Sequence, residues 1–321
     1  MSCLVIIEAD ATGISEVSTE TITFARGLGT DIDALVVGDA EALLEQLGEY
    51  GVARVFSVSG DGFDAYAPGA WAAAAVATIE ASGASTILAG GSPRGNEVLA
   101  HVAARRNVLM AANVVEVDQQ APVQVSRQVF GGAALEVMSL DESLAVFSVA
   151  GHACAPAPAE AATSPEVEAV SVTPSSSDLA VRVARTEAGA PDQSGNLKSA
   201  KVVVGAGRGA GSADAFGELE TLTELLGASL GVSRVVTSLG WRPHHEQVGQ
   251  TGSRISPDLY IPCGISGAIQ HWAGCSSAKT ILAINSDPDA PMVTRAHYAV
   301  IGDLHEIVPA INEEIRRRAS A

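Results

Sequence analysis

The chain has 321 residues, which is long enough for two domains, and 47% of its residues are hydrophobic, so a sizeable core is expected. With 37 Asp and Glu against 19 Lys and Arg, the formal net charge of −18 argues against broad contact with nucleic-acid phosphates, which requires basic surfaces. No run approaches the roughly 20 apolar residues of a membrane span, and the four cysteines form no C-x-x-C pair, so we expect a cytoplasmic protein that is not membrane-embedded and has no metal cluster.

The first half alternates short apolar runs with helical segments. Its first run reads as a strand and not as a signal peptide, because it meets Glu8 and has no basic region before it. Helices are expected at 41–50 and 66–83, between strands, and this order predicts a parallel sheet covered on both faces. The predicted strands of this sheet are 3–9, 33–38, 52–59 and 85–91.

The segments that follow have a different pattern. Residues 123–140 alternate apolar and polar side chains around a Gly-Gly pair, and with 143–150 they predict antiparallel strands added to the sheet. Residues 152–177 and 187–196 are rich in Pro, Ala, Ser and Gly, as linkers are, with extended strands expected at 167–173 and 179–185. We therefore predict an N-terminal α/β domain over 1–189 and a second domain over 190–321.

The second half repeats the strand and helix pattern. A helix is expected at 213–228, and each predicted strand ends in a polar or glycine-rich turn. Such turns gather at the carboxyl edge of a parallel sheet, where ligands bind in open α/β folds. The predicted strands lie within 200–209, 234–241, 259–267, 280–287 and 297–303.

Two of these turns are candidate ligand sites. Residues 204–211 (VGAGRGAG) fit the dinucleotide pattern G-x-G-x-x-G/A, although a plain tight turn explains it equally well in a chain with 32 glycines. Arg208 favours a phosphate or purine ligand there. Residues 264–271 (GISGAIQH) predict a second turn that presents backbone amides at a helix start, with His271 one turn inside. A purely structural histidine is the alternative.

A serine hydrolase is a weaker interpretation of the same turn. Ser266, His271 and Asp303 supply the residue types of a triad, and residues 264–268 are a variant of the nucleophile elbow. However, the chain order Ser, His, Asp differs from that of the hydrolase fold, in which histidine comes last. No oxyanion-loop motif precedes the turn either.

A set of motifs across 200–309 resembles the α subunit of the electron transfer flavoproteins. The motifs are GVSRVV, GWRP, QVGQTG, PDLYI, GISGAIQH, AINSDPDAP and GDL. A looser similarity, in STETITFARGLG, LVVG and LAGGSPRGNEVLAHVAAR, extends it over nearly the whole chain. The resemblance implies two α/β domains with parallel-type sheets flanked by helices, the C-terminal one a doubly wound FAD-binding fold.

The resemblance also implies one FAD and its contacts. Expected cofactor-binding residues are Arg208 on the adenosine side; Ser233 and Arg234 near the flavin; Gln247, Val248, Gly249, Gln250 and Thr251 along the ring and ribityl chain, with the Thr251 hydroxyl near N5; Ser266, Gly267, Ala268, Ile269, Gln270 and His271 at the pyrimidine edge and ribityl chain; and Asn285, Asp303 and Leu304 at the ADP end. Cationic Arg234 and His271 are expected to favour the negative charge of a reduced ring.

The implied function is that of an electron carrier and not of a substrate-converting enzyme. Paired with a β subunit as a heterodimer through its N-terminal domain, the chain would take electrons from acyl-CoA or other dehydrogenases, as in fatty acid β-oxidation. It would pass them singly to a membrane quinone oxidoreductase. The alternatives are a bifurcating or nitrogen-fixation-type relative that uses NADH, and a nicotinamide-dependent enzyme on the same fold.

Overall fold

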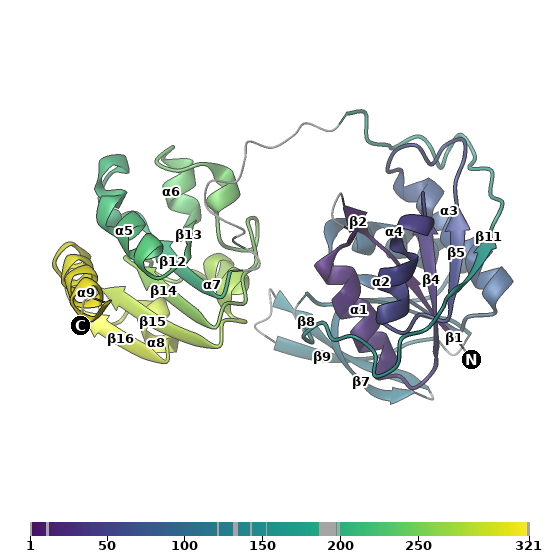
Figure 1. Ribbon diagram of the computed structural model, residues 1–321, viewed down its shortest axis with the longest axis horizontal. Helices are drawn as coiled ribbons and strands as arrows, with labels where there is room; N and C mark the ends of the chain where they lie inside the picture. Colours follow the sequence, from purple (N-terminus) through teal and green to yellow (C-terminus); the bar gives the residue numbers. More distant parts are fainter. Residues whose placement is uncertain are drawn as a thin grey trace. The chain divides into compact units, whose positions relative to one another are not determined.

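The computed structural model describes residues 2–10, 13–120, 122–130, 134–141, 143–151, 153–185, 197 and 200–319. These residues form two compact units (Figure 1). Unit 1 comprises the described residues up to 187, and unit 2 comprises the described residues from 188 onward. The predicted boundary near 190 lies outside the described residues. Within the described chain, no helix is both long enough and apolar enough to cross a membrane.

Unit 1 is built on a nine-stranded sheet in the order β11-β5-β4-β1-β6-β10-β7-β8-β9. The strands from β11 to β7 are mutually parallel, as predicted for strands separated by helices. A two-stranded ribbon, β2 with β3, lies outside this sheet. The strands are β1 (Ser2–Ile6), β2 (Ala9–Asp10), β3 (Gly13–Ile14), β4 (Asp31–Val37), β5 (Arg54–Val58), β6 (Thr86–Gly90), β7 (Met110–Gln120), β8 (Val123–Val129), β9 (Ala134–Ser139), β10 (Ala145–Val149) and β11 (Glu166–Ala169).

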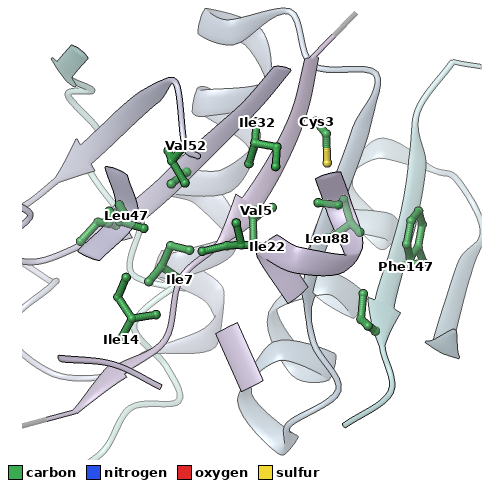
Figure 2. Close-up of a cluster of buried hydrophobic side chains, with 14 of the residues drawn as sticks. Cys3, Val5, Ile7, Ile14, Ile22, Ile32, Leu47, Val52, Leu88 and Phe147 are labelled. Atoms are coloured by element: carbon green, nitrogen blue, oxygen red, sulfur yellow. The ribbon is translucent and has the colours of Figure 1, made fainter. Parts of the chain in front are cut away.

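Helices cover both faces of this sheet, so the central strands are apolar on both sides. Cys3 and Val5 of β1 face Ile22 of α1, in the cluster that Figure 2 shows with Leu88 and Phe147. The alternate β1 residues, Leu4 and Ile6, pack with α3 and α4 on the opposite face. The helices are α1 (Glu16–Arg26), the 3-10 turn η1 (Glu41–Leu43) with α2 (Leu44–Glu49), α3 (Pro68–Ser82) and α4 (Pro93–Arg106).

The antiparallel part of the sheet differs from the prediction. The predicted pair within 123–140 exists, since β8 and β9 are antiparallel, although its Gly-Gly turn lies outside the described residues. The segment 143–150 is not antiparallel, because its strand β10 pairs in parallel with both β6 and β7. On its other side β8 pairs antiparallel with β7, a strand that was not predicted from the sequence.

Of the two strands predicted in the linker, one exists in a shorter form and the other does not form. The strand predicted over 167–173 is the shorter β11 (Glu166–Ala169), whose four residues are all exposed at the sheet edge. Residues 179–185 form no strand. Their alternating valines include Val181, which is 66% exposed, so the pattern there does not reflect a buried face.

Unit 2 contains a five-stranded parallel sheet in the order β13-β12-β14-β15-β16. The chain moves from β12 outward to β13 on one side and then to β14 on the other, so the order reverses between β12 and β14. Such a switch point leaves a crevice at the carboxyl ends of the two strands, as in flavodoxin-like sheets. The strands are β12 (Val202–Ala206), β13 (Ser229–Val232), β14 (Leu259–Cys263), β15 (Thr280–Asn285) and β16 (Tyr298–Ile301).

Helices again cover both faces. One face packs against α5, α6 and α9 through residues such as Val204 and Leu222, and the other packs against α7 and α8 through Tyr260 and Met292. The helical elements are η3 (Arg208–Ala210), η4 (Ala213–Phe216), α5 (Gly217–Leu225), α6 (Arg234–Ser238), η5 (His244–Glu246), α7 (Ile269–Cys275), α8 (Pro291–Arg295) and α9 (Leu304–Ala319). The described residues therefore confirm the predicted fold class, a doubly wound parallel sheet in the second unit.

One strand of unit 2 was assigned to the wrong residues. The segment 234–241 was predicted as a strand because of its paired valines, yet it begins with helix α6. The strand is the preceding segment, β13, whose four residues are all buried. Ser233 follows it in an extended conformation and occupies the N-cap position of α6, which is typical of a serine before a helix.

Backbone contact between two glycine turns shapes the switch point. The turn after β12 lies against the turn after β14, and the Gly207 and Gly209 amides donate to the Cys263 and Gly264 carbonyls over 2.9 and 3.1 Å. A Cβ at Gly207 would overlap the Gly264 carbonyl oxygen. Gly264 itself has φ +62°, which glycine adopts without steric cost. The turns meet this closely only because neither carries side chains at the crossing.

We therefore expect Gly207→Ala to destabilise unit 2 by about 1–3 kcal/mol through overpacking. The φ of Gly207, −106°, suits alanine, so the cost is steric and not conformational. Gly217→Ala is the matched control, because a Cβ at that helical position meets nothing within 4 Å and alanine is the better helix former. Urea unfolding measures both, and equal stability of the two variants would contradict the tight crossing.

Candidate functional site

A cavity of about 1030 Å³ opens at the carboxyl edge of the unit 2 sheet. Its size lies at the upper end of the range for small-molecule and cofactor sites. All five strands contribute through the residues that follow them, with the 247–251 segment on one side. The lining residues are Arg208, Gly209, Ser233, Arg234, Val235, Ser238, Leu239, Gln247, Val248, Gly249, Gln250, Thr251, Gly264, Ile265, Ser266, Gly267, Ala268, Gln270, His271, Asn285, Ser286, Asp287, Ala290, Gly302, Asp303, Leu304 and His305.

The cavity brings together the predicted cofactor-binding residues with one exception. Ile269 is not among the lining residues, and its side chain is 57% exposed. Several residues that line the cavity were not predicted individually as cofactor-binding, although Gly209, Gly264 and Ile265 lie in the two turns predicted as candidate ligand sites. Most of them are sequence neighbours of predicted cofactor-binding residues. A prediction that included every residue of the turns at the carboxyl ends of the strands could therefore have found them. They are Gly209, Val235, Ser238, Leu239, Gly264, Ile265, Ser286, Asp287, Ala290, Gly302 and His305.

The loop formed by residues 247–253 is folded back on itself beside α7. The Val248 amide donates to the Val232 carbonyl over 2.9 Å, which attaches the start of the loop to the end of β13. The Gln250 amide donates to the Gln270 carbonyl over 2.7 Å and so attaches the loop to α7. A Cβ at Gly252 would overlap the Gln247 carbonyl, so the loop closes only with glycine there. These backbone contacts fix the loop although its composition is polar and rich in glycine.

An ion pair anchors the segment that precedes this loop. The Arg242 guanidinium donates two hydrogen bonds, of 2.7 and 2.8 Å, to the buried carboxylate of Glu246, and a third to Glu220 over 2.7 Å. These carboxylates raise the pKa of Arg242, chiefly through the hydrogen bonds that Glu246 accepts from it. A fork-shaped guanidinium and a carboxylate define one geometry, so the chain enters the 247–253 loop from a fixed point.

A short chain of side-chain hydrogen bonds holds Thr251. The buried Gln247 amide donates to the Thr251 hydroxyl over 3.0 Å, and the Thr237 hydroxyl lies 2.8 Å from the other end of the same amide. Thr237 comes from α6 and Thr251 from the cavity wall. Two elements that are separate in the sequence are therefore linked through one buried glutamine.

His271 is held inside the protein and is neutral. Its Nε2 lies 2.8 Å from the Tyr260 hydroxyl oxygen, and the two rings are stacked. Burial lowers the pKa of His271 to about 4, partly offset by the Val248 backbone. In the ligand-free protein the expected positive charge on His271 is therefore absent near neutral pH, because burial opposes charge more strongly than the nearby polar groups favour it.

The triad of the hydrolase interpretation is not assembled. The hydrogen-bond partner of His271 is Tyr260 and not Ser266. Asp303 accepts a hydrogen bond from the His305 backbone amide, as a capping residue at the start of α9. Among the described residues, no chain of hydrogen bonds runs from a serine through a histidine to an aspartate. The cavity therefore has no serine activated in the manner of a catalytic triad.

Some polar groups around the cavity have no partner in the described protein. The Ser233 hydroxyl is buried without a hydrogen bond. Arg208 and Arg234 line the cavity and form no ion pair with any residue that the structure describes. Buried polar atoms without partners are rare, and in a cavity they mark positions that a ligand can satisfy. Over the described ranges, no cluster of His, Cys, Asp and Glu has the arrangement of a metal site.

Comparisons with known proteins agree with this geometry. Residues 3–175 match the family model described as the electron transfer flavoprotein domain, and residues 196–276 match the electron transfer flavoprotein FAD-binding domain. The chain is 36% identical to the electron transfer flavoprotein subunit alpha of Mycobacterium leprae over 98% of both chains. It is 31% identical to that of Syntrophomonas wolfei over 98% of both. It is 34% identical to the probable mitochondrial subunit alpha of Caenorhabditis elegans, over 97% of this chain and 92% of the other.

The buried environment of His271 predicts its titration in the ligand-free protein. Between about pH 6.5 and pH 4 the unfolded chain binds a proton here that the folded chain does not, so the stability linked to this group falls as the pH falls through that range. The imidazole carbon-bound proton signals in NMR spectra, assigned by their loss in His271→Gln, are expected to stay at their neutral positions from pH 7.5 to pH 5.5. A midpoint between pH 6 and pH 7 would contradict the burial argument.

Proposed function

Because the chain belongs to the electron transfer flavoprotein α-subunit family, we propose that the unit 2 cavity binds FAD and carries electrons through it. The observation that carries the proposal is the cavity at the switch point between β12 and β14, lined by glycine turns and by unpaired polar groups. This is the position at which doubly wound sheets bind nucleotide cofactors. A family model described as FAD-binding matches the same region.

The residues around the cavity suit the parts of FAD. The crossed turns at Gly207–Gly209 and Gly264–Gly267 leave bare backbone, which lets a pyrophosphate approach closely. Arg208 beside them supplies positive charge for that group. The unpartnered hydroxyl of Ser233 and the Thr251 hydroxyl offer hydrogen bonds to the polar edges of a flavin ring. Val235 and Leu239 add apolar surface for the ring itself.

The protein would contribute positioning and electrostatics. Flavin supplies the one- and two-electron chemistry when it is bound. Arg234, which is free of ion pairs with the described residues, favours negative charge in the cavity, whereas Asp287 and Asp303 oppose it from the β15 and β16 side. His271, which burial keeps neutral in the ligand-free protein, is held by a hydrogen bond with Tyr260 and adds a polar group to the cavity wall.

We further propose the partners that the family implies. The relatives are α subunits, so this chain would act in the cytoplasm as a heterodimer with a β subunit. Its electrons would come from dehydrogenases such as acyl-CoA dehydrogenases and leave, one at a time, to a membrane quinone oxidoreductase. In this role the chain carries electrons and converts no substrate of its own.

Co-expression with a β-type partner tests the proposal. The purified complex should be yellow, release one FAD for each α chain on denaturation, and be reduced in two separable one-electron steps. A colourless complex would contradict FAD binding. A complex that binds a nicotinamide in the cavity instead would support the dehydrogenase alternative.

Replacing Arg234, one of the two arginines that line the cavity, should lower the reduction potential of the flavin. Arg234→Gln removes a positive charge that favours the reduced, more negative ring, so the potential should fall. We expect the variant to bind the one-electron-reduced flavin about fivefold more weakly while its affinity for oxidised flavin is unchanged. The potential of the couple between these two forms then falls by about 40 mV. Arg317→Gln, at the far end of α9 where Arg317 pairs with Glu314, makes the same charge change away from the cavity. Spectroelectrochemical titration measures both, and equal potentials would count against the role of Arg234.

A further inference from the structure

Arg242 connects three elements of unit 2 although it is not part of the cavity wall. Its guanidinium donates to both carboxylate oxygens of Glu246, over 2.7 and 2.8 Å, and to Glu220 of α5 over 2.7 Å. It also lies over the ring of Phe216, 5.6 Å from the ring centroid, and Phe216 belongs to the core cluster that includes residues of β12. Arg242 and these three partners are not among the described residues that line the cavity.

The cavity wall begins directly after Glu246. Residues 247–251 all line the cavity, and the backbone of Glu246 leads into them. The Glu246 side chain is only 4% exposed, so its carboxylate depends on partners within the protein, and both of its oxygens accept hydrogen bonds from Arg242. The position of the wall therefore depends on where Arg242 holds this carboxylate.

The geometry of the pair matters as well as its charge. A guanidinium and a carboxylate joined by two parallel hydrogen bonds, here called the fork, have one preferred relative orientation. Because Arg242 is itself held by Glu220 and Phe216, the fork fixes Glu246 in direction and in distance. A point charge at residue 242 would neutralise Glu246 and leave its direction free.

We propose that Arg242 is a positioning residue for the cofactor, because its fork determines in what fraction of the molecules residues 247–251 form the cavity wall. The inference deepens the proposed function and rests on it for the identity of the ligand. A ligand that contacts the formed wall binds more weakly when only part of the molecules have it. Arg242 thus acts on the cofactor through the loop, without touching it.

Two backbone hydrogen bonds report whether the wall is formed. The Val248 amide donates to the Val232 carbonyl over 2.9 Å, and the Gln250 amide donates to the Gln270 carbonyl over 2.7 Å. These amides are protected from hydrogen exchange with solvent only while the two bonds are intact. The Gly207 amide, in the crossed turns at the same sheet edge, is the internal reference for the rest of the unit.

The Arg242→Lys variant keeps a positive charge beside Glu246 and removes the fork. Each charge-assisted hydrogen bond changes an equilibrium constant by about tenfold or more, so we expect the formed wall to remain in about one tenth of the molecules. In the complex with the β-type partner, the apparent dissociation constant of FAD should then rise about tenfold. With the cofactor removed, the Val248 and Gln250 amides should lose their protection while the Gly207 amide keeps it.

A double variant separates orientation from charge. Arg242→Met combined with Glu246→Met removes the fork and leaves no buried charge unpaired, and such apolar replacements often preserve stability. We expect a wild-type midpoint in urea and FAD binding that is still about tenfold weaker. Wild-type affinity would mean that Arg242 only neutralises Glu246, and would overturn the proposal. If the midpoint falls, Arg242→Lys decides, because the Gly207 amide separates local opening from general destabilisation.

Arg317→Lys is the matched control. Arg317 forms the same fork with Glu314 near the end of α9, with two hydrogen bonds of 2.7 Å, and does not line the cavity. Its FAD affinity and amide protection should equal those of the wild type. Equal protection of the Val248 and Gln250 amides in Arg242→Lys and wild type would overturn the proposal whether or not FAD binds. A wild-type complex that binds no FAD would contradict the proposed function instead, because the exchange measurement requires no ligand.

Discussion

The close crossing of two backbone turns at the switch point determines the rest of unit 2. Gly207 and Gly209 meet Gly264 through main-chain atoms, at distances that leave no room for a Cβ. The carboxyl ends of β12 and β14 thus present bare backbone to the cavity between them. In a sheet of the same strand order, side chains at this crossing would fill the crevice or push the two turns apart. The polar residues at its edge would then have no cavity to line.

The 247–253 loop also contributes to the cavity wall, through residues 247–251. It is polar and glycine-rich because it must fold back over α7 through backbone hydrogen bonds and place Gln247 inside while leaving Thr251 at the wall. The Arg242 and Glu246 ion pair fixes where the loop begins. Burial keeps His271 neutral, so the positive charge of the cavity comes from its two arginines. The Arg242 and Glu246 ion pair therefore positions the loop, the loop supplies polar groups to the cavity, and the two arginines supply its positive charge.

Much of this was predictable from the sequence where one local pattern dominates. The buried runs of β12 and β14 and the glycine turns after them were assigned correctly, as was the gathering of polar residues at one edge. Segment 234–241 was misassigned because paired valines favour a strand, whereas the strand β13 already ends at Val232 and helix α6 begins at Arg234. The charge of His271 could not be read from sequence, because it depends on burial against Tyr260. The pairing of β10 with β6 is likewise a tertiary contact without a local signal.

The most direct test of the account is a crystal structure of the FAD-loaded protein with its β-type partner. We expect the pyrophosphate over the crossed turns at Gly207–Gly209 and Gly264–Gly267, and the isoalloxazine ring between Thr251 and Ser233. A structure in which these turns contact no part of the cofactor, or in which the cavity of unit 2 is empty while FAD is bound elsewhere, would contradict it.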